Sequence, residues 1–165
     1  MQNITQQKVA FLDRDGTLIY EPADDFQVDR IDKLFILPGV IDGLQLLQKK
    51  GYILVIVSNQ DGLGTKKFPR KSFDLPHNKM LRIFKDNGIE FEQVYICPHL
   101  PKDRCECRKP KIGLVKEFLE TNTIDMKESL VYGNQESDRL FADMLGIRFF
   151  SVLTNGQCTL RNNLL

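Results

Sequence analysis

Short apolar runs alternate with helical apolar patterns along the chain, and this alternation limits the folds that it can adopt. The runs are rich in β-branched or aromatic residues, which is typical of buried strands. Strands that alternate with helices favour a parallel sheet covered on both faces. We therefore predict an α/β fold with a doubly wound, Rossmann-like parallel sheet. Its strands are expected near residues 9–12, 53–57, 91–97, 130–132 and 149–153, and its helices near 38–51, 70–88, 114–119 and 140–146.

The length and composition of the chain predict one folded domain. Its 165 residues lie near the usual size of a single domain, which is roughly 100–150 residues. Hydrophobic residues make up 42% and charged residues 27%, and such a composition argues against disorder. We expect a single domain over residues 1–165, with its core at about 8–153 and a loose polar tail at 154–165.

The charge balance excludes two classes of partner. Lysine and arginine number 23 against 22 aspartates and glutamates, so the chain has no basic surplus for nucleic acid or for an anionic membrane. No apolar run approaches the ~20 residues of a membrane-spanning helix, and the polar segment Met1–Lys8 lacks the apolar core of a signal peptide. We therefore expect a cytoplasmic protein.

An acidic turn, Asp13-Arg14-Asp15-Gly16-Thr17, follows the first predicted strand. Its glycine comes fourth, whereas a calcium loop of the EF-hand type has glycine sixth, so that type of site is excluded. A solvated turn without function remains an alternative. Because ligands of parallel sheets bind beyond the carboxyl ends of the strands, the position of this turn favours a functional site.

Phosphoryl transfer is the chemistry that two carboxylates in this arrangement favour. An ionised carboxylate beside Mg²⁺ can attack phosphorus and form an acyl phosphate. A second acid, two residues later, can protonate the leaving alcohol and then activate water. In this interpretation Asp13 is the nucleophile and Asp15 is the general acid/base.

The acidic turn resembles motif one of the haloacid dehalogenase-like phosphohydrolases, and the family's later motifs follow in the expected order. The resemblance implies that Ser58, at the end of the second predicted strand, binds the transferring phosphate. It also implies that Lys109 neutralises the charge of that phosphate. We therefore expect Asp13, Asp15, Ser58 and Lys109 to form the catalytic group.

The fourth motif departs from the family pattern at one position. It reads Gly133-Asn134-Gln135-Glu136-Ser137-Asp138, with asparagine in place of the first aspartate. The resemblance implies Mg²⁺ bound at Asp13, Asp15 and Asn134. An amide offers an oxygen ligand but no negative charge, so we expect weakened Mg²⁺ binding and low activity.

Three cysteines and one histidine lie within eleven residues, in the pattern Cys-x-His-x₅-Cys-x-Cys. Three thiolates and one imidazole suit tetrahedral Zn²⁺, and a full set of four protein ligands indicates a structural site. A disulfide is disfavoured in a reducing compartment, and four unrelated residues remain the alternative. We predict a zinc-binding loop, which also fixes Lys109, with the ligands Cys97, His99, Cys105 and Cys107.

The cysteine pattern followed by Arg-Lys-Pro resembles two related phosphatase families, for histidinol phosphate and for heptose bisphosphate. The segments 21–30 and 59–65 are more similar to the first family. That resemblance implies Mg²⁺-dependent hydrolysis of histidinol phosphate, a small phosphorylated substrate, in histidine biosynthesis. It also implies substrate binding by Glu21, Asn59 and Arg108, and a carboxylate at Glu21 can pair with the ammonium group of the substrate.

Two other functions remain open on the sequence. A heptose bisphosphate phosphatase shares the motifs but has no cation to recognise. A non-catalytic domain would keep the fold and the zinc; Asn134 favours it, whereas the intact Asp13 and Ser58 weigh against it. In many bacteria the histidinol-phosphate phosphatase domain is fused to imidazoleglycerol-phosphate dehydratase, so the resemblance implies such a fusion partner.

Overall fold

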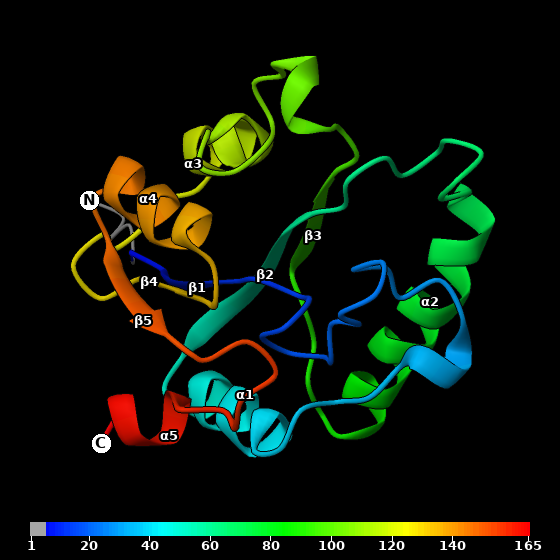
Figure 1. The fold of residues 1–165 in the computed structure, drawn as a ribbon. Coiled ribbons are helices and arrows are strands. Elements are labelled where there is room, and N and C mark those ends of the chain that lie inside the picture. The colour runs from blue at the N-terminus through cyan, green and yellow to red at the C-terminus, as the bar shows by residue number, and fades with distance from the viewer. Residues whose placement is uncertain (1–5) are drawn as a thin grey trace.

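A five-stranded parallel sheet organises the computed structural model, which describes residues 6–165 (Figure 1). The strands lie in the order β3-β2-β1-β4-β5, and every neighbouring pair is parallel. The second and third strands lie on one side of β1, and the fourth and fifth lie on the other. This order confirms the predicted doubly wound α/β fold. The strands are β1 (Lys8–Leu12), β2 (Tyr52–Asn59), β3 (Gln93–Cys97), β4 (Leu130–Gly133) and β5 (Arg148–Ser151).

Helices cover both faces of this sheet. One face packs against α1, α2 and α5, and the other packs against α3 and α4 (Figure 1). Both faces of the sheet are therefore buried from solvent, which explains why the strand sequences are continuous apolar runs. The α-helices are α1 (Val40–Lys49), α2 (Arg70–Asp86), α3 (Lys116–Thr121), α4 (Glu136–Leu145) and α5 (Leu160–Asn163), and short 3-10 helices are η1 (Ile31–Lys33), η2 (Pro101–Asp103) and η3 (Gly113–Val115).

Alternate residues of β1 face the two helical layers. Ala10 and Leu12 are buried on the side of α1, whereas Val9 and Phe11 are buried on the side of α3 and α4. The Phe11 ring packs edge-to-face on Phe118, with 6.2 Å between the ring centroids. Burial of an apolar side chain of this size contributes roughly 1.5–3 kcal/mol. The strand that precedes the acidic turn is thus fixed from both faces.

The predicted elements match the structure to within four residues at their ends, with one exception. The helix expected near 114–119 is divided into η3 and α3. The N–H of Gly113 donates to the main-chain oxygen of Glu106 at 3.1 Å, and a Cβ atom on Gly113 would lie 2.3 Å from that oxygen. This close approach to the preceding loop explains why the segment starts as a tight turn.

The chain after β5 packs on the body of the domain, so the prediction of a loose tail at 154–165 is wrong. The N–H of Cys158 donates to the main-chain oxygen of Pro38 at 2.9 Å, and the N–H of Thr159 donates to the Tyr132 hydroxyl at 3.0 Å. Leu160 is fully buried, and α5 lies beside α1 (Figure 1). Buried apolar side chains such as Leu160 hold the tail in place, and the polar composition of the segment does not predict this contact.

No helix within residues 6–165 has both the length and the apolar composition needed to cross a membrane. The prediction that Met1–Lys8 is not a signal peptide falls largely on residues 1–5, which lie outside the described residues. The single domain expected over residues 1–165 includes that segment and stays a prediction.

Candidate active site and zinc centre

One cavity of about 380 Å³ opens at the carboxyl ends of β1, β2 and β4. The order in which the chain adds strands to the sheet reverses between β1 and β4, and α/β proteins bind ligands at such switch points. The structure brings together every catalytic and substrate-binding residue expected from the sequence. These lining residues are Asp13, Asp15, Glu21, Ser58, Asn59, Arg108 and Lys109.

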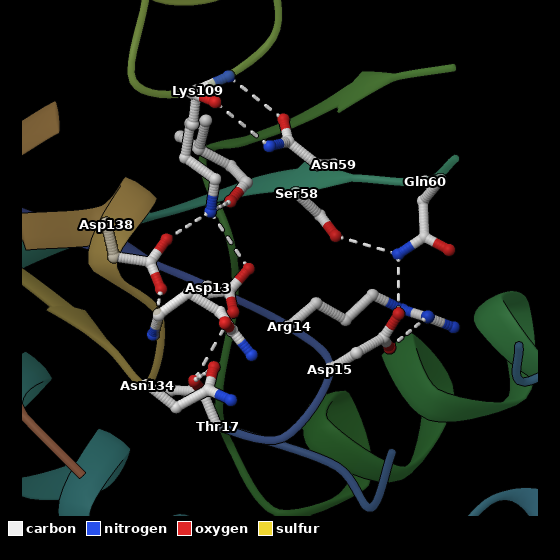
Figure 2. A network of polar contacts seen from close by, with 12 residues as sticks. Asp13, Arg14, Asp15, Thr17, Ser58, Asn59, Gln60, Lys109, Asn134 and Asp138 are labelled. Atoms are coloured by element: carbon white, nitrogen blue, oxygen red, sulfur yellow. Dashed lines mark hydrogen bonds and ion pairs between the residues drawn. The ribbon is translucent and has the colours of Figure 1, made fainter. Parts of the chain in front are cut away.

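Lys109 connects two buried carboxylates at the base of the cavity (Figure 2). Its Nζ lies 2.9 Å from Asp13 Oδ1 and 2.6 Å from Asp138 Oδ1, and it donates to the main-chain oxygen of Val57 at 2.6 Å. Burial and the charge of Asp138 raise the pKa of Asp13 to about 7, while Lys109 lowers it. Burial opposes the charge of Lys109, but Asp13 and Asp138 hold its pKa above the usual range. Lys109 therefore supplies a permanent positive charge.

Asp138 is a site residue that sequence reasoning misses. Its Oδ2 accepts a hydrogen bond from the N–H of Gln135 at 3.0 Å, which caps the start of α4. A Cβ atom at Gly133 would lie 2.4 Å from Asp138 Oδ2, so only glycine permits this approach. The match of Asp138 to the last position of the fourth motif is the signal that could have identified it.

Two buried side chains hold the carboxylate of Asp15. Its Oδ1 accepts from Arg14 Nη1 at 2.5 Å, and its Oδ2 accepts from Gln60 Nε2 at 2.7 Å. The same Gln60 nitrogen donates to Ser58 Oγ at 2.8 Å (Figure 2). Gln60 thus links the predicted general acid/base to the predicted phosphate-binding hydroxyl. No motif in the sequence indicates this role.

Arg14 is fully buried, although arginine usually lies at the surface. Its guanidinium carbon lies 4.8 Å from the centre of the Phe73 ring. Its Nε and Nη2 atoms have no hydrogen-bond partner among the described residues. Because a buried charge without an opposite charge is strongly unfavourable, Asp15 is essential for keeping Arg14 inside. The position of a basic residue between two aspartates is the only sequence signal for this pair.

Asn134 lies beside Asp13 and Asp15, where the sequence predicts that it is a ligand of Mg²⁺. One end of its amide lies 2.9 Å from Asp13 Oδ2 and 3.2 Å from the main-chain oxygen of Asp15, and Thr17 Oγ1 donates to it at 2.9 Å. With nitrogen at that end, the amide donates to Asp13. With oxygen there, three oxygens converge, as the ligands of Mg²⁺ do. Asp13, the main-chain oxygen of Asp15 and Asn134 therefore fit a magnesium site.

Two nearby acids do not replace the charge that Asn134 lacks. Asp138 forms an ion pair with Lys109, with 2.6 Å between Asp138 Oδ1 and Lys109 Nζ. Glu136 lies at the surface, where its Oε2 accepts from Arg139 Nε at 2.9 Å. The candidate magnesium site therefore carries one charge fewer than the family pattern provides.

Acidic side chains surround the mouth of the cavity. Glu21, Asp25 and Asp61 line it. Asp25 pairs with Lys33 and Asp61 pairs with Arg108, so the negative charge of the mouth comes mainly from Glu21. Burial, and then the charges of Asp15 and Asp138, raise the pKa of Glu21 to about 7. A nearby cation favours the ionised form of such a carboxyl group. The mouth is therefore suited to a ligand that carries a positive charge.

Arg108 and Asn59 line the cavity but have partners within the protein. Arg108 pairs with Asp61 and donates to the main-chain oxygen of His99 at 3.2 Å. Asn59 Nδ2 donates to the main-chain oxygen of Lys109 at 3.2 Å, and Asn59 Oδ1 accepts from the N–H of Lys109 at 3.0 Å. Asn59 therefore fixes the main chain of Lys109. Substrate binding by Arg108 and Asn59 stays a prediction.

The four predicted zinc ligands gather at the end of β3 and in the loop after it, and their ligand atoms lie within 4.8 Å of one another. Cys97 Sγ lies 3.7 Å from Cys105 Sγ and 3.6 Å from His99 Nδ1, and Cys107 Sγ lies 3.1 Å from both Cys97 Sγ and His99 Nδ1. Atoms bound about 2.3 Å from a tetrahedral zinc are about 3.8 Å apart, so a bound metal requires only a small outward shift of Cys107. Burial raises the pKa of the Cys97 thiol to about 12, so its thiolate depends on a bound metal. The cluster is Cys97, His99, Cys105 and Cys107, and it does not include Cys158.

The cysteine–histidine cluster is directly connected to the cavity. The N–H of Arg108 donates to Cys105 Sγ at 3.3 Å. Lys109 is the next residue, and its side chain reaches Asp13. A metal that orders this loop therefore also orders the positive charge in the cavity.

Comparison with known proteins identifies the family. Residues 8–152 match the family described as polynucleotide kinase 3 phosphatase. The chain belongs to this phosphatase family. It is 56% identical over 141 residues to the histidine biosynthesis bifunctional protein HisB of Baumannia cicadellinicola subsp. Homalodisca coagulata. It is 48% identical over 142 residues to the protein of the same name from Campylobacter jejuni subsp. doylei. Each match covers 86% of this chain and 40% of the relative, so the chain spans about 40% of their length.

Solved structures are similar over most of the chain. A D,D-heptose 1,7-bisphosphate phosphatase from B. bronchiseptica, complexed with magnesium and phosphate, has a TM-score of 0.79 at 28% identity. That match covers 96% of this chain and 86% of the other. A haloacid dehalogenase-like phosphatase from Mesorhizobium loti shares the fold, with a TM-score of 0.75 at 21% identity, over 86% of this chain and 70% of the other. The chain thus shares the fold of haloacid dehalogenase-like phosphatases and belongs to a family of phosphatases.

Proposed function

We propose that this chain hydrolyses histidinol phosphate to histidinol and phosphate in histidine biosynthesis. The observation that carries the proposal is the carboxylate of Glu21 in the same cavity as Asp13. Histidinol phosphate has a phosphate at one end and an ammonium group on the carbon next to the ester-bearing CH₂, so it matches a carboxylate that lies above a phosphate-binding base. The relatives that bear a histidine biosynthesis name support the same substrate.

The reaction proceeds in two steps on the residues of the cavity. An oxygen of Asp13 forms a bond to phosphorus as the ester bond to the alcohol oxygen breaks, and Asp15 gives its proton to that oxygen. Asp15 then takes a proton from water, which attacks phosphorus and returns Asp13 to a free carboxylate. Ser58 and Lys109 hold the phosphoryl oxygens. Asp13, Asp15 and Asn134 would hold Mg²⁺, which would offset the repulsion between the carboxylate and the phosphate.

We propose that the ion in the cysteine cluster is a structural Zn²⁺. Four protein ligands leave no open position for substrate, which is typical of a structural site. The role of the ion is to order the loop that ends at Lys109. Thiolate ligands persist in a reducing compartment, and this supports a cytoplasmic location.

The acidic mouth favours a small cationic substrate over the two alternatives. A polynucleotide is a polyanion, and binding usually requires clustered lysine or arginine, whereas Glu21 and the ion pairs Asp25–Lys33 and Asp61–Arg108 line this entrance. A heptose bisphosphate brings a second phosphate, which the Glu21 carboxylate repels. The solved heptose bisphosphate phosphatase is 28% identical, against 46–56% for the histidine biosynthesis relatives.

The relatives also support a fusion partner. They are named as bifunctional proteins, and this chain spans about 40% of their length. We propose that imidazoleglycerol-phosphate dehydratase is the second activity in such longer proteins.

Phosphate release from three substrates tests the proposed function. Histidinol phosphate, D-glycero-D-manno-heptose 1,7-bisphosphate and a 3′-phosphorylated oligonucleotide are compared at equal concentration, with and without Mg²⁺. We expect the highest kcat/KM for histidinol phosphate and dependence on Mg²⁺. A higher value for either other substrate would reject the assignment, and no hydrolysis of any of them at high Mg²⁺ would favour a non-catalytic domain.

A further inference from the structure

The chain after β5 passes the cavity before it reaches α5. Asn155 lies in this segment and uses both ends of its amide on the main chain of Glu21. Its Oδ1 accepts from the N–H of Glu21 at 2.7 Å, and its Nδ2 donates to the main-chain oxygen of Glu21 at 3.0 Å. The N–H of Asn155 also donates to the main-chain oxygen of Gly16 at 3.0 Å. Asn155 therefore fixes two points after β1, although 134 residues separate it from Glu21.

The same paired arrangement occurs on the other side of the cavity. Asn59 forms two hydrogen bonds with the N–H and the main-chain oxygen of Lys109. Each asparagine thus holds the main chain of a residue whose charged side chain lines the cavity. At Lys109 the arrangement fixes the charge at the base, and at Glu21 it fixes the charge at the mouth.

The backbone conformation at Asn155 favours an asparagine at this position. Its φ of 59° lies in the left-handed region, which asparagine and glycine adopt more readily than other residues. The preceding residue, Thr154, has its Oγ1 2.9 Å from Asn134 Nδ2. A Cβ atom on Gly16 would lie 3.2 Å from Thr154 Cγ2, so this segment packs tightly against the acidic turn. The tail therefore supports the acidic turn and Glu21 from behind, without lining the cavity itself.

We propose that Asn155 is a positioning residue that sets the preference of the cavity for phosphate esters that carry a cationic amine. It acts by fixing the main chain of Glu21, and the inference rests on the proposed function, in which Glu21 pairs with the ammonium group of the substrate. A substrate-binding group contributes fully only when its own position is fixed. Loss of Asn155 leaves the Glu21 carboxylate present but free to move away from the amine.

Asn155→Gly tests this role, because glycine keeps a positive φ but removes both side-chain hydrogen bonds. We compare kcat/KM for histidinol phosphate with kcat/KM for phenyl phosphate, which has no amine. The ratio of the two values is expected to fall about 5–30-fold, as for the loss of one or two hydrogen bonds, through a higher KM for histidinol phosphate. Asn162→Gly makes the same exchange at an exposed position of α5 and should leave the ratio unchanged.

A double-mutant cycle with Glu21→Gln separates this proposal from the proposed function. If Asn155 acts through Glu21, Asn155→Gly lowers the ratio much less in the Glu21→Gln background than in the parent. If Glu21→Gln lowers the ratio and Asn155→Gly does not, the role of Asn155 is overturned while the amine site stands. If Glu21→Gln leaves the ratio unchanged, the amine site itself is wrong.

A second variant keeps the proposal testable if Asn155→Gly does not fold. Asn155→Asp keeps the shape of the side chain and can accept from the N–H of Glu21, but it has no donor for the main-chain oxygen. The same ratio is measured. A fall supports the positioning role, and a ratio equal to that of the parent overturns it.

Discussion

The ammonium group of Lys109 lies 2.9 Å from the carboxylate of Asp13, although 96 residues separate them in the sequence. This contact joins the zinc loop to the end of β1. It places a positive charge beside the candidate nucleophile, where an anionic phosphate must approach. The cysteine–histidine cluster and the candidate reaction centre are therefore one structural unit.

Lys109→Met should abolish turnover and also destabilise the fold. The substitution leaves Asp13 and Asp138 buried without their common partner, and breaking a buried ion pair in this way costs about 3–5 kcal/mol. Urea unfolding without Mg²⁺ measures the loss. Lys116→Met, at a side chain that is 72% exposed, should change the free energy of unfolding by no more than about 0.5 kcal/mol. Equal stability of Lys109→Met and the parent would show that the pair is not buried in solution.

Arg14→Met should slow the protonation of the leaving group, because Asp15 loses the guanidinium that orients it. The loss in kcat is expected to approach the roughly 10²–10⁴-fold worth of a general acid/base. It should be larger for histidinol phosphate than for nitrophenyl phosphate, whose leaving group needs little protonation. Arg70→Met, at an exposed arginine, is the matched control. Equal losses on both substrates would mean that Arg14 does not act through Asp15.

Asn134→Asp should tighten Mg²⁺ binding and raise turnover. The amide lies 2.9 Å from Asp13 Oδ2, and aspartate at that position restores one negative charge beside the ion. We expect a gain in affinity of roughly 5–150-fold, which corresponds to about 1–3 kcal/mol. Titration of Mg²⁺ by calorimetry and by activity measures both effects. Identical titrations for the variant and the parent would place Asn134 away from the metal.

The preference for the amine-bearing substrate should depend on pH. Burial and the neighbouring acids raise the pKa of Glu21 to about 7, so this group is mainly protonated below that pH and cannot pair with an ammonium group. The ratio of kcat/KM for histidinol phosphate to that for phenyl phosphate should therefore rise as the pH increases through about 7. Both substrates share the phosphate titration, so the ratio cancels it, but only histidinol phosphate has an imidazole, which titrates at about pH 6.5. Glu21→Gln therefore gives the reference curve for the substrate alone, and a rise of the same size in that variant would exclude Glu21 as its source.

Sequence patterns predict those features of this protein that depend on residues close together in the sequence. Apolar runs locate the strands, and the carboxyl ends of parallel strands meet at one edge, so Asp13 and Ser58 are expected to lie together. The zinc cluster is predictable for the same reason, since its ligands lie within eleven residues. Fixed ligand spacing leaves few arrangements for such a loop.

Contacts between distant segments are harder to predict. Arg14 is a charged residue, and composition places it at the surface, whereas the fold buries it against Phe73 from α2. Gln60 and Asn155 carry no motif, and their partners become visible only when separate loops meet at the sheet edge. The polar composition of the tail suggests a loose segment, but Leu160 anchors it and Asn155 reaches the site.

The most direct test of this account is a single-turnover reaction with histidinol phosphate, quenched in acid and followed by peptide mass spectrometry. The account predicts a transient mass increase of one phosphoryl group on the peptide that contains Asp13, and its absence in Asp13→Asn, together with loss of turnover. Hydrolysis of histidinol phosphate by Asp13→Asn at the parent rate would contradict the account.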